Sequence, residues 1–184
     1  MIRFAGAVGA AFMTMAVFTA SPGAATAHPS PVPAHVLRAY MAQVEKVRVP
    51  VDALLGGTDP ILHAYNAHQV TPAQSSLEMS KLEERFAGYV VAMQEINLSN
   101  KTLARDNKPY AYTYYLEDNY LSTLASDLNE SDFDNLPDTQ DQQRLAIIVW
   151  RTQMEILATH DGVTLPADIQ QAGRGEIVPS LSGS

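Results

Sequence analysis

An acidic stretch in the second half of the chain carries the side chains whose type and spacing come closest to a known chemistry. Between Lys108 and Arg144 the sequence holds eight carboxylates and no lysine or arginine. Residues 127–138 place oxygen-bearing side chains at positions 1, 3, 5, 9 and 12 of a twelve-residue loop, a spacing that resembles an EF-hand calcium loop. The candidate ligands of Ca²⁺ or another hard cation are Asp127, Asn129, Ser131, Asn135 and Asp138.

The resemblance to a calcium loop is partial. Asp132 takes the sixth position, where such a loop uses glycine for its sharp turn, and Asp134 takes the eighth, where an apolar residue is usual. Pro137 directly precedes the last candidate ligand. The competing interpretation is a solvated acidic loop that caps the neighbouring helices.

A cluster of tyrosines precedes the acidic loop. Its members are Tyr110, Tyr112, Tyr114, Tyr115 and Tyr120. One buried helix stripe needs fewer rings, so we expect some of them at the surface, where tyrosine favours recognition because it brings a large area and a polar tip. Two alternatives stay open: ordinary packing in the core, or a pocket for a planar ligand such as haem.

The histidines form no clear metal site. His28 would be the first residue after a predicted cleavage, and its amine and imidazole together with a second imidazole would suit Cu(II), although an incidental first residue is the simpler interpretation. His63 and His68 are five residues apart and point about 140° apart on a helix, which is poor ligand geometry. We interpret them, and His160 near a helix end, as structural.

Catalytic motifs give no lead. The chain has no cysteine, which excludes a thiolate nucleophile, disulfides and Cys-ligated metals. It also lacks a nucleophile elbow, an H-E-x-x-H helix, a P-loop and a dinucleotide-binding glycine motif. An enzyme is therefore not the favoured class; a catalytic alternative would require a closed polar pocket that contains Arg or Lys and a carboxylate.

Composition indicates one globular domain with an acidic surface. The 184 residues are 46% hydrophobic and 17% charged, and the net charge is -8. This charge argues against nucleic acid or anionic lipid as partner, because both attract clustered cations. We expect no membrane insertion of the mature chain.

The N-terminus has the features of a secretory signal peptide. Arg3 supplies the positive start, residues 5–20 are apolar, and Ala25-Thr26-Ala27 is a typical cleavage site. We therefore expect residues 1–27 to be removed and the mature protein to be secreted or periplasmic.

Hydrophobic periodicity predicts an all-α fold. After an extended proline-rich lead-in over residues 28–33, a single domain over residues 34–172 should form an antiparallel bundle of about four long helices and one or two short ones. Pro50 should kink or split the first helix. Thr71 and Gln74 match a capping box at the start of a helix. Residues 99–108 are predicted to form a loop before a helix that begins at Pro109, and residues 173–184 a flexible tail.

The last long helix is expected to be buried on most sides. Its core face should consist of Leu145, Ile148, Thr152 and Ile156, widened by Ile147, Val149 and Trp150. The sequence as a whole favours a secreted, acidic, non-catalytic binding module that uses the tyrosine-rich helix and the acidic loop. Its partner would be a protein or a small molecule, basic or aromatic in character. The alternatives are an extracellular Ca²⁺-binding protein and a small secreted helical enzyme without a recognisable motif.

Overall fold

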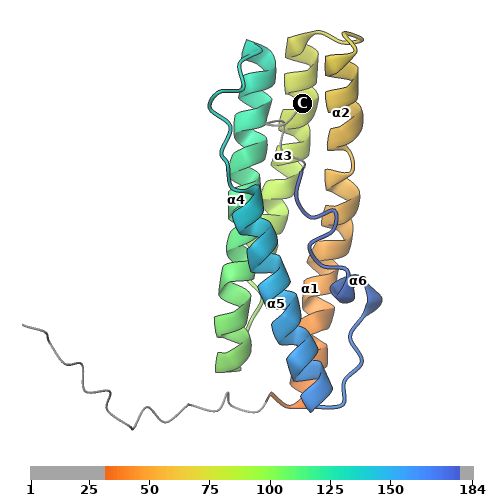
Figure 1. The fold of residues 1–184 in the computed structure, drawn as a ribbon, viewed down its shortest axis with the longest axis vertical. Helices are drawn as coiled ribbons and strands as arrows, with labels where there is room; N and C mark the ends of the chain where they lie inside the picture. The colour runs from red at the N-terminus through yellow and green to blue at the C-terminus, as the bar shows by residue number, and fades with distance from the viewer. Residues whose placement is uncertain (1–31, 179–184) are drawn as a thin grey trace, which may run out of the picture.

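The computed structural model describes residues 32–178, and within this range it is built of helices without strands (Figure 1). The helices are α1 (Ala34–Leu55), α2 (Thr58–Asn66), α3 (Pro72–Gln94), α4 (Lys101–Glu130), α5 (Gln140–His160) and α6 (Ala167–Gln170). The all-α prediction is confirmed. The predicted signal peptide, His28 and residues 179–184 lie outside the described range. Of the described helices, none combines the length and apolar character that crossing a bilayer requires.

Helix α1 continues through Pro50 as one helix. Apolar residues spaced three and four apart form a buried stripe along it, including Tyr40, Val44, Val51 and Leu54. Arg48 lies among these residues and is buried with them, which the stripe alone does not predict.

Helix α3 begins with the predicted capping box. The Thr71 hydroxyl accepts a hydrogen bond from the Gln74 backbone N–H, and the Gln74 side chain accepts one from the Thr71 backbone N–H. Pro72 follows at the first helical position, where its missing N–H costs nothing. Local chemistry is therefore sufficient to start this helix.

Helix α4 begins at Lys101, so the predicted loop over residues 99–108 is wrong. The Asn100 side chain accepts hydrogen bonds from the backbone N–H groups of Thr102 and Leu103 and caps the helix. Leu103 and Asn107 are buried, so this polar stretch has a core face of its own. Pro109 sits inside the helix instead of starting it.

Helix α5 buries only part of the predicted face: Ile147 and Trp150 are buried, but the residues at the centre of that face are not. Leu145 is 63% exposed, Ile156 is 56% exposed and Ile148 is 38% exposed. The buried residues of α5 are Gln140, Gln143, Ile147, Trp150, Met154 and Ala158. Residues 145–150 are all apolar, so their sequence does not show which side of the helix faces the core. Gln143 lies on the buried side, where Glu117 and the Thr113 carbonyl accept hydrogen bonds from its side chain.

The chain returns to the bundle after α6. Residues 171–178, called here the C-terminal strap, run back along the helices (Figure 1). The structure places the first part of the expected flexible tail, residues 173–178, against the bundle, where Glu176 and Val178 are buried. Gly173 and Gly175 adopt φ of 92° and 82°, which L side chains rarely adopt, so the path of the strap depends on glycine.

Core substitutions should separate the buried stripes from the exposed face of α5. Phe86→Ala and Leu121→Ala should each lower the free energy of unfolding by about 2–5 kcal/mol, because both side chains are fully buried. Ile148→Ala should change it by less than about 1 kcal/mol, because this side chain is partly in water. Urea unfolding of the three variants measures this, and an Ile148→Ala cost as large as the other two would contradict the assigned face.

Candidate functional site

The structure divides the predicted tyrosine surface in two. Tyr110, Tyr114 and Tyr120 are buried in the core and are not accessible to a partner. Tyr112 and Tyr115 are each 50% exposed, and their rings stack with centroids 5.7 Å apart. The predicted recognition surface is thereby reduced to one exposed tyrosine pair on α4.

A pocket of about 710 Å³, called here the α4 groove, lies beside this pair. It lies between α4, the end of α3 and the connection that joins these two helices. The groove is lined by Gln94, Ile96, Leu98, Ala104, Asn107, Lys108, Pro109, Ala111 and Tyr112. Most of these side chains are apolar, so the groove suits an apolar or aromatic group.

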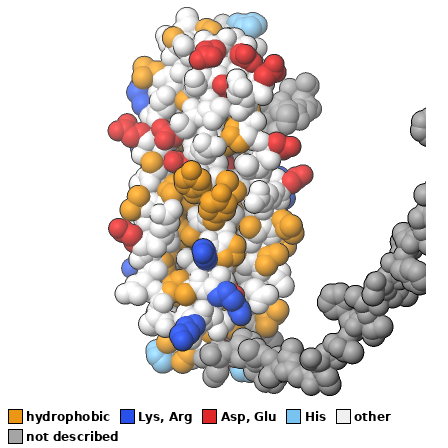
Figure 2. Space-filling model, turned by 90° about the vertical axis from the view of Figure 1, so that its left-hand side faces the viewer, with side chains coloured by type: hydrophobic (Ala, Val, Ile, Leu, Met, Phe, Trp, Pro, Cys, Tyr) orange, Lys and Arg blue, Asp and Glu red, His pale blue; other side chains and the backbone are white. Residues whose placement is uncertain are grey.

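Charges are ordered along the exposed face of α4. Lys101, Arg105 and Lys108 precede Tyr112 and Tyr115 at intervals of four and three residues, which places all five on one helix face. Figure 2 shows hydrophobic side chains gathered at mid-height on this side of the molecule, with Lys and Arg below them and Asp and Glu above. The groove therefore has a cationic border on one side.

The proposed calcium loop is only partly a loop. Asp127 and Asn129 still belong to α4, and Ser131 ends the helix with a left-handed φ of 55° and accepts a hydrogen bond from the Tyr65 hydroxyl. Asn135 and Asp138 follow in the exposed connection to α5. Among residues 32–178, no three His, Cys, Asp or Glu side chains lie close enough to hold a metal ion. Calcium binding stays a prediction that these positions do not favour.

His63, His68 and His160 are not among the residues that line the groove. His63 is exposed on α2, and His68 follows the end of that helix with a φ of 54°. His160 is the last residue of α5, and its Nδ1 lies 2.8 Å from an Asp161 carboxylate oxygen. These positions agree with the structural roles expected for them.

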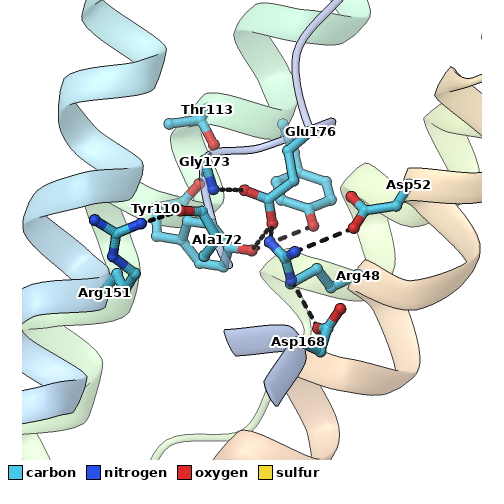
Figure 3. Close-up of polar contacts among 10 residues, drawn as sticks. Arg48, Asp52, Tyr110, Thr113, Arg151, Asp168, Ala172, Gly173 and Glu176 are labelled. Atoms are coloured by element: carbon cyan, nitrogen blue, oxygen red, sulfur yellow. Dashed lines mark hydrogen bonds and ion pairs between the residues drawn. The ribbon is translucent and has the colours of Figure 1, made fainter. Parts of the chain in front are cut away.

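A buried guanidinium is the main feature that the sequence did not reveal. Arg48 is 1% exposed, and its Nε donates to Asp168 at 2.7 Å while its Nη2 donates to Asp52 at 3.1 Å. Its Nη1 forms an ion pair with Glu176. Figure 3 shows the three carboxylates converging on this one side chain from α1, α6 and the strap. We call these four residues the Arg48 cluster.

The cluster is electrostatically unbalanced, because three carboxylates face one cation. Burial lowers the pKa of Arg48, but the hydrogen bond that Arg48 donates to Asp168 and the neighbouring negative charges outweigh it and leave the pKa above its ordinary value. Arg48 therefore stays charged. Burial raises the pKa of Asp52 to about 6, although the Arg48 charge opposes this.

Aromatic residues connect the cluster to the groove. The Tyr110 hydroxyl donates to Glu176 at 3.0 Å, and its ring stacks on Trp150 with centroids 4.0 Å apart. Trp150 Nε1 donates to the Tyr40 hydroxyl, which donates to Asn107 Oδ1, both at 2.7 Å. Because Asn107 lines the α4 groove, this path runs from the groove to the strap.

Glu117 is a second buried carboxylate that holds the strap. One of its oxygens accepts from Gln143 Nε2 and the other accepts from the Val178 backbone N–H, both at 2.8 Å. Burial raises the pKa of Glu117 to about 7, against the effect of these two hydrogen bonds.

A signal for the Arg48 cluster exists in the sequence. Arg48 stands four residues after Val44 and three before Val51, inside the apolar stripe of the first helix. A charge in such a stripe implies a buried partner, but two of its three partners, Asp168 and Glu176, lie more than a hundred residues away, and local patterns cannot identify them.

Comparisons with known proteins add no functional assignment. No family model matches this chain, and no curated protein or solved structure matches it. The function is therefore inferred from the residues and contacts of the chain itself.

Stability should depend on pH through Glu117. Its pKa lies higher in the folded protein than the ordinary value of 4.5, so the folded state binds the extra proton and the stabilisation falls as pH rises from about 5 to 8. The full shift corresponds to about 3 kcal/mol as an upper bound. Urea unfolding across this range should give a flatter pH dependence for Glu117→Gln than for the wild type.

The matched control is Glu155→Gln, which removes an exposed carboxylate of α5. It should leave the pH dependence of unfolding as it is in the wild type. Parallel curves for the wild type and Glu117→Gln would exclude Glu117 as the titrating group.

Proposed function

We propose that this protein is a secreted, non-catalytic binding protein whose ligand surface is the α4 groove. The observation that carries the proposal is an apolar groove of about 710 Å³ beside two stacked, half-exposed tyrosines and a lysine. Exposed aromatic rings next to an apolar depression are typical of recognition sites, because the rings bring contact area at low entropic cost.

The ligand is a peptide or small molecule that brings an aromatic or apolar group into the groove and an acidic group to Lys108. Ile96, Leu98 and Pro109 supply the apolar contacts. The cations along the same face of α4 favour an anionic group at this end, through complementary charge. This ligand is aromatic, as the sequence led us to expect. It is acidic rather than basic, because the charged residue that lines the groove is a lysine.

Binding without catalysis agrees with the chemistry of the groove lining. Among its lining residues, Lys108 and Tyr112 are titratable, and no carboxylate or histidine accompanies them. The combination of Arg or Lys with a carboxylate, which the catalytic alternative requires, is therefore not present among the residues that line the groove. We further propose that the helices form an antiparallel bundle and that residues 1–27 direct the chain out of the cytoplasm.

Calcium binding at residues 127–138 is the second candidate. One carboxylate oxygen of Asp127 is buried without a hydrogen-bond partner, and burial together with the charges of Asp132 and Glu130 raises the pKa of Asp127. A cation would relieve this repulsion. Thermal melts in millimolar Ca²⁺ and in excess chelator test the idea: Ca²⁺ should raise the melting temperature of the wild type and not of Asp127→Asn, and superimposed wild-type curves would exclude it.

An anionic dye with aromatic rings tests the α4 groove directly. Anilinonaphthalene sulfonate should bind the wild type more tightly than phenylnaphthylamine, which has the same rings without the sulfonate. Tyr112→Ala should weaken both dyes about tenfold, as expected for an aromatic hot spot. Lys108→Glu should weaken the sulfonate dye selectively, because only that dye presents a negative charge to the groove.

The matched control is Arg144→Glu, a charge reversal at an exposed position of α5 away from the groove. It should leave the affinity for both dyes unchanged. Unchanged dye affinity in Tyr112→Ala and Lys108→Glu would refute the groove as the ligand surface.

A further inference from the structure

We propose that the Arg48 cluster is a binding site for a carboxylate ligand and that Glu176 of the C-terminal strap occupies this site as a built-in competitor. The site lies apart from the α4 groove, since the two share no residue. This proposal therefore goes beyond the function proposed above, and its test is independent of the test of the α4 groove.

The carboxylate of Glu176 is held on both oxygens. Oε1 pairs with Arg48 Nη1 and accepts from the Tyr110 hydroxyl at 3.0 Å, and Oε2 accepts from the Gly173 backbone N–H at 3.0 Å. Arg48 and Tyr110 belong to α1 and α4, and both are fully buried. Figure 3 shows them on either side of the Glu176 carboxylate, so the helices supply the cation and the hydroxyl and the strap supplies the carboxylate.

Glu176 can leave the cluster without leaving the charge of Arg48 unpaired. Arg48 also pairs with Asp52 and Asp168, so removing Glu176 leaves the guanidinium neutralised and reduces the excess of negative charge. An uncompensated buried charge, which makes most buried ion pairs costly to open, does not arise here. The opened position is the Nη1 side of Arg48.

The strap has the features of a segment that can leave. It has no helical or strand structure, and Arg174 and Gly175 at its middle are exposed. Besides the contacts of Glu176, two hydrogen bonds hold it: Arg151 Nη1 donates to the Ala172 carbonyl, and the Val178 N–H donates to Glu117. Ala172 and Val178 are buried, and a segment outside the helices can open locally while the helices stay folded.

The surroundings of the site define the ligand class. The Tyr110 ring is stacked on Trp150 directly beside the Glu176 carboxylate, which gives the site a flat aromatic wall next to a guanidinium. A small organic acid with an aromatic or apolar body fits this pairing. Because the strap must move aside, the apparent affinity of such an acid is lowered by the fraction of molecules in which the site is open.

Chemical rescue tests the site in the full chain. Glu176→Ala removes the carboxymethyl group of the side chain, and acetate supplies the equivalent group in solution. Acetate should raise the melting temperature of Glu176→Ala, whereas acetamide, and sodium chloride at the same ionic strength, should not. The wild type should show no such acetate effect. Equal responses to acetate and acetamide would overturn the carboxylate site.

Competition by the strap is tested with 3-phenylpropionate, an acid with an aromatic body. Trp150, the single tryptophan of the chain, reports binding by its fluorescence because it stacks on Tyr110. Glu176→Ala should bind this acid about tenfold or more tightly than the wild type does. Tyr110→Phe in the same background should weaken binding, since it removes the hydroxyl donor and keeps the ring.

Two further variants complete the experiment. Arg174→Ala changes an exposed residue of the strap and should bind 3-phenylpropionate as the wild type does. Glu176→Gln keeps the size of the side chain, so it serves if Glu176→Ala fails to fold, and it should also bind more tightly than the wild type. Equal affinities in the wild type and the folded Glu176 variants would refute the competitor, and no binding in any of them would refute the site.

Discussion

One buried guanidinium constrains how the described chain packs. Moving the charge of Arg48 out of water costs several kcal/mol, so the fold must bring partners to it. One partner, Asp52, comes from the next turn of the same helix, but Asp168 and Glu176 come from α6 and the strap. The C-terminal residues therefore have to return to α1. In doing so they also contact α4 through Glu117 and α5 through Arg151, so the strap links three helices.

Local chemistry explains the parts of the fold that the sequence predicts correctly. The capping box at Thr71 and the stripe of α1 depend on residues within a few positions of each other. Two features depend on distant residues and are mispredicted. Helix α4 starts before Pro109 because Leu103 and Asn107 find a core to pack against, and α5 buries Gln143 because Glu117 and the Thr113 carbonyl accept its hydrogen bonds.

The candidate sites show the same division. The spacing of Tyr110 and Tyr114 places them on the buried face of α4, and that of Tyr112 and Tyr115 places these two on the opposite side, so periodicity alone separates the two sets. The strap offers no such signal. Gly173 and Gly175 precede Glu176, and such a composition is typical of a mobile tail. Glu176 is buried because it pairs with the guanidinium of Arg48 in the first helix.

Helix α4 serves both candidate sites with different faces. Its buried face contributes Tyr110 and Glu117, which hold the strap, and its exposed face contributes Lys108 and Tyr112, which border the groove. The two faces are joined through the core by Asn107, Tyr40 and Trp150, with two hydrogen bonds, and by the stack of Trp150 on Tyr110. Trp150 therefore reaches Glu176 of the Arg48 cluster through one residue, Tyr110, and reaches the groove through Tyr40 and Asn107.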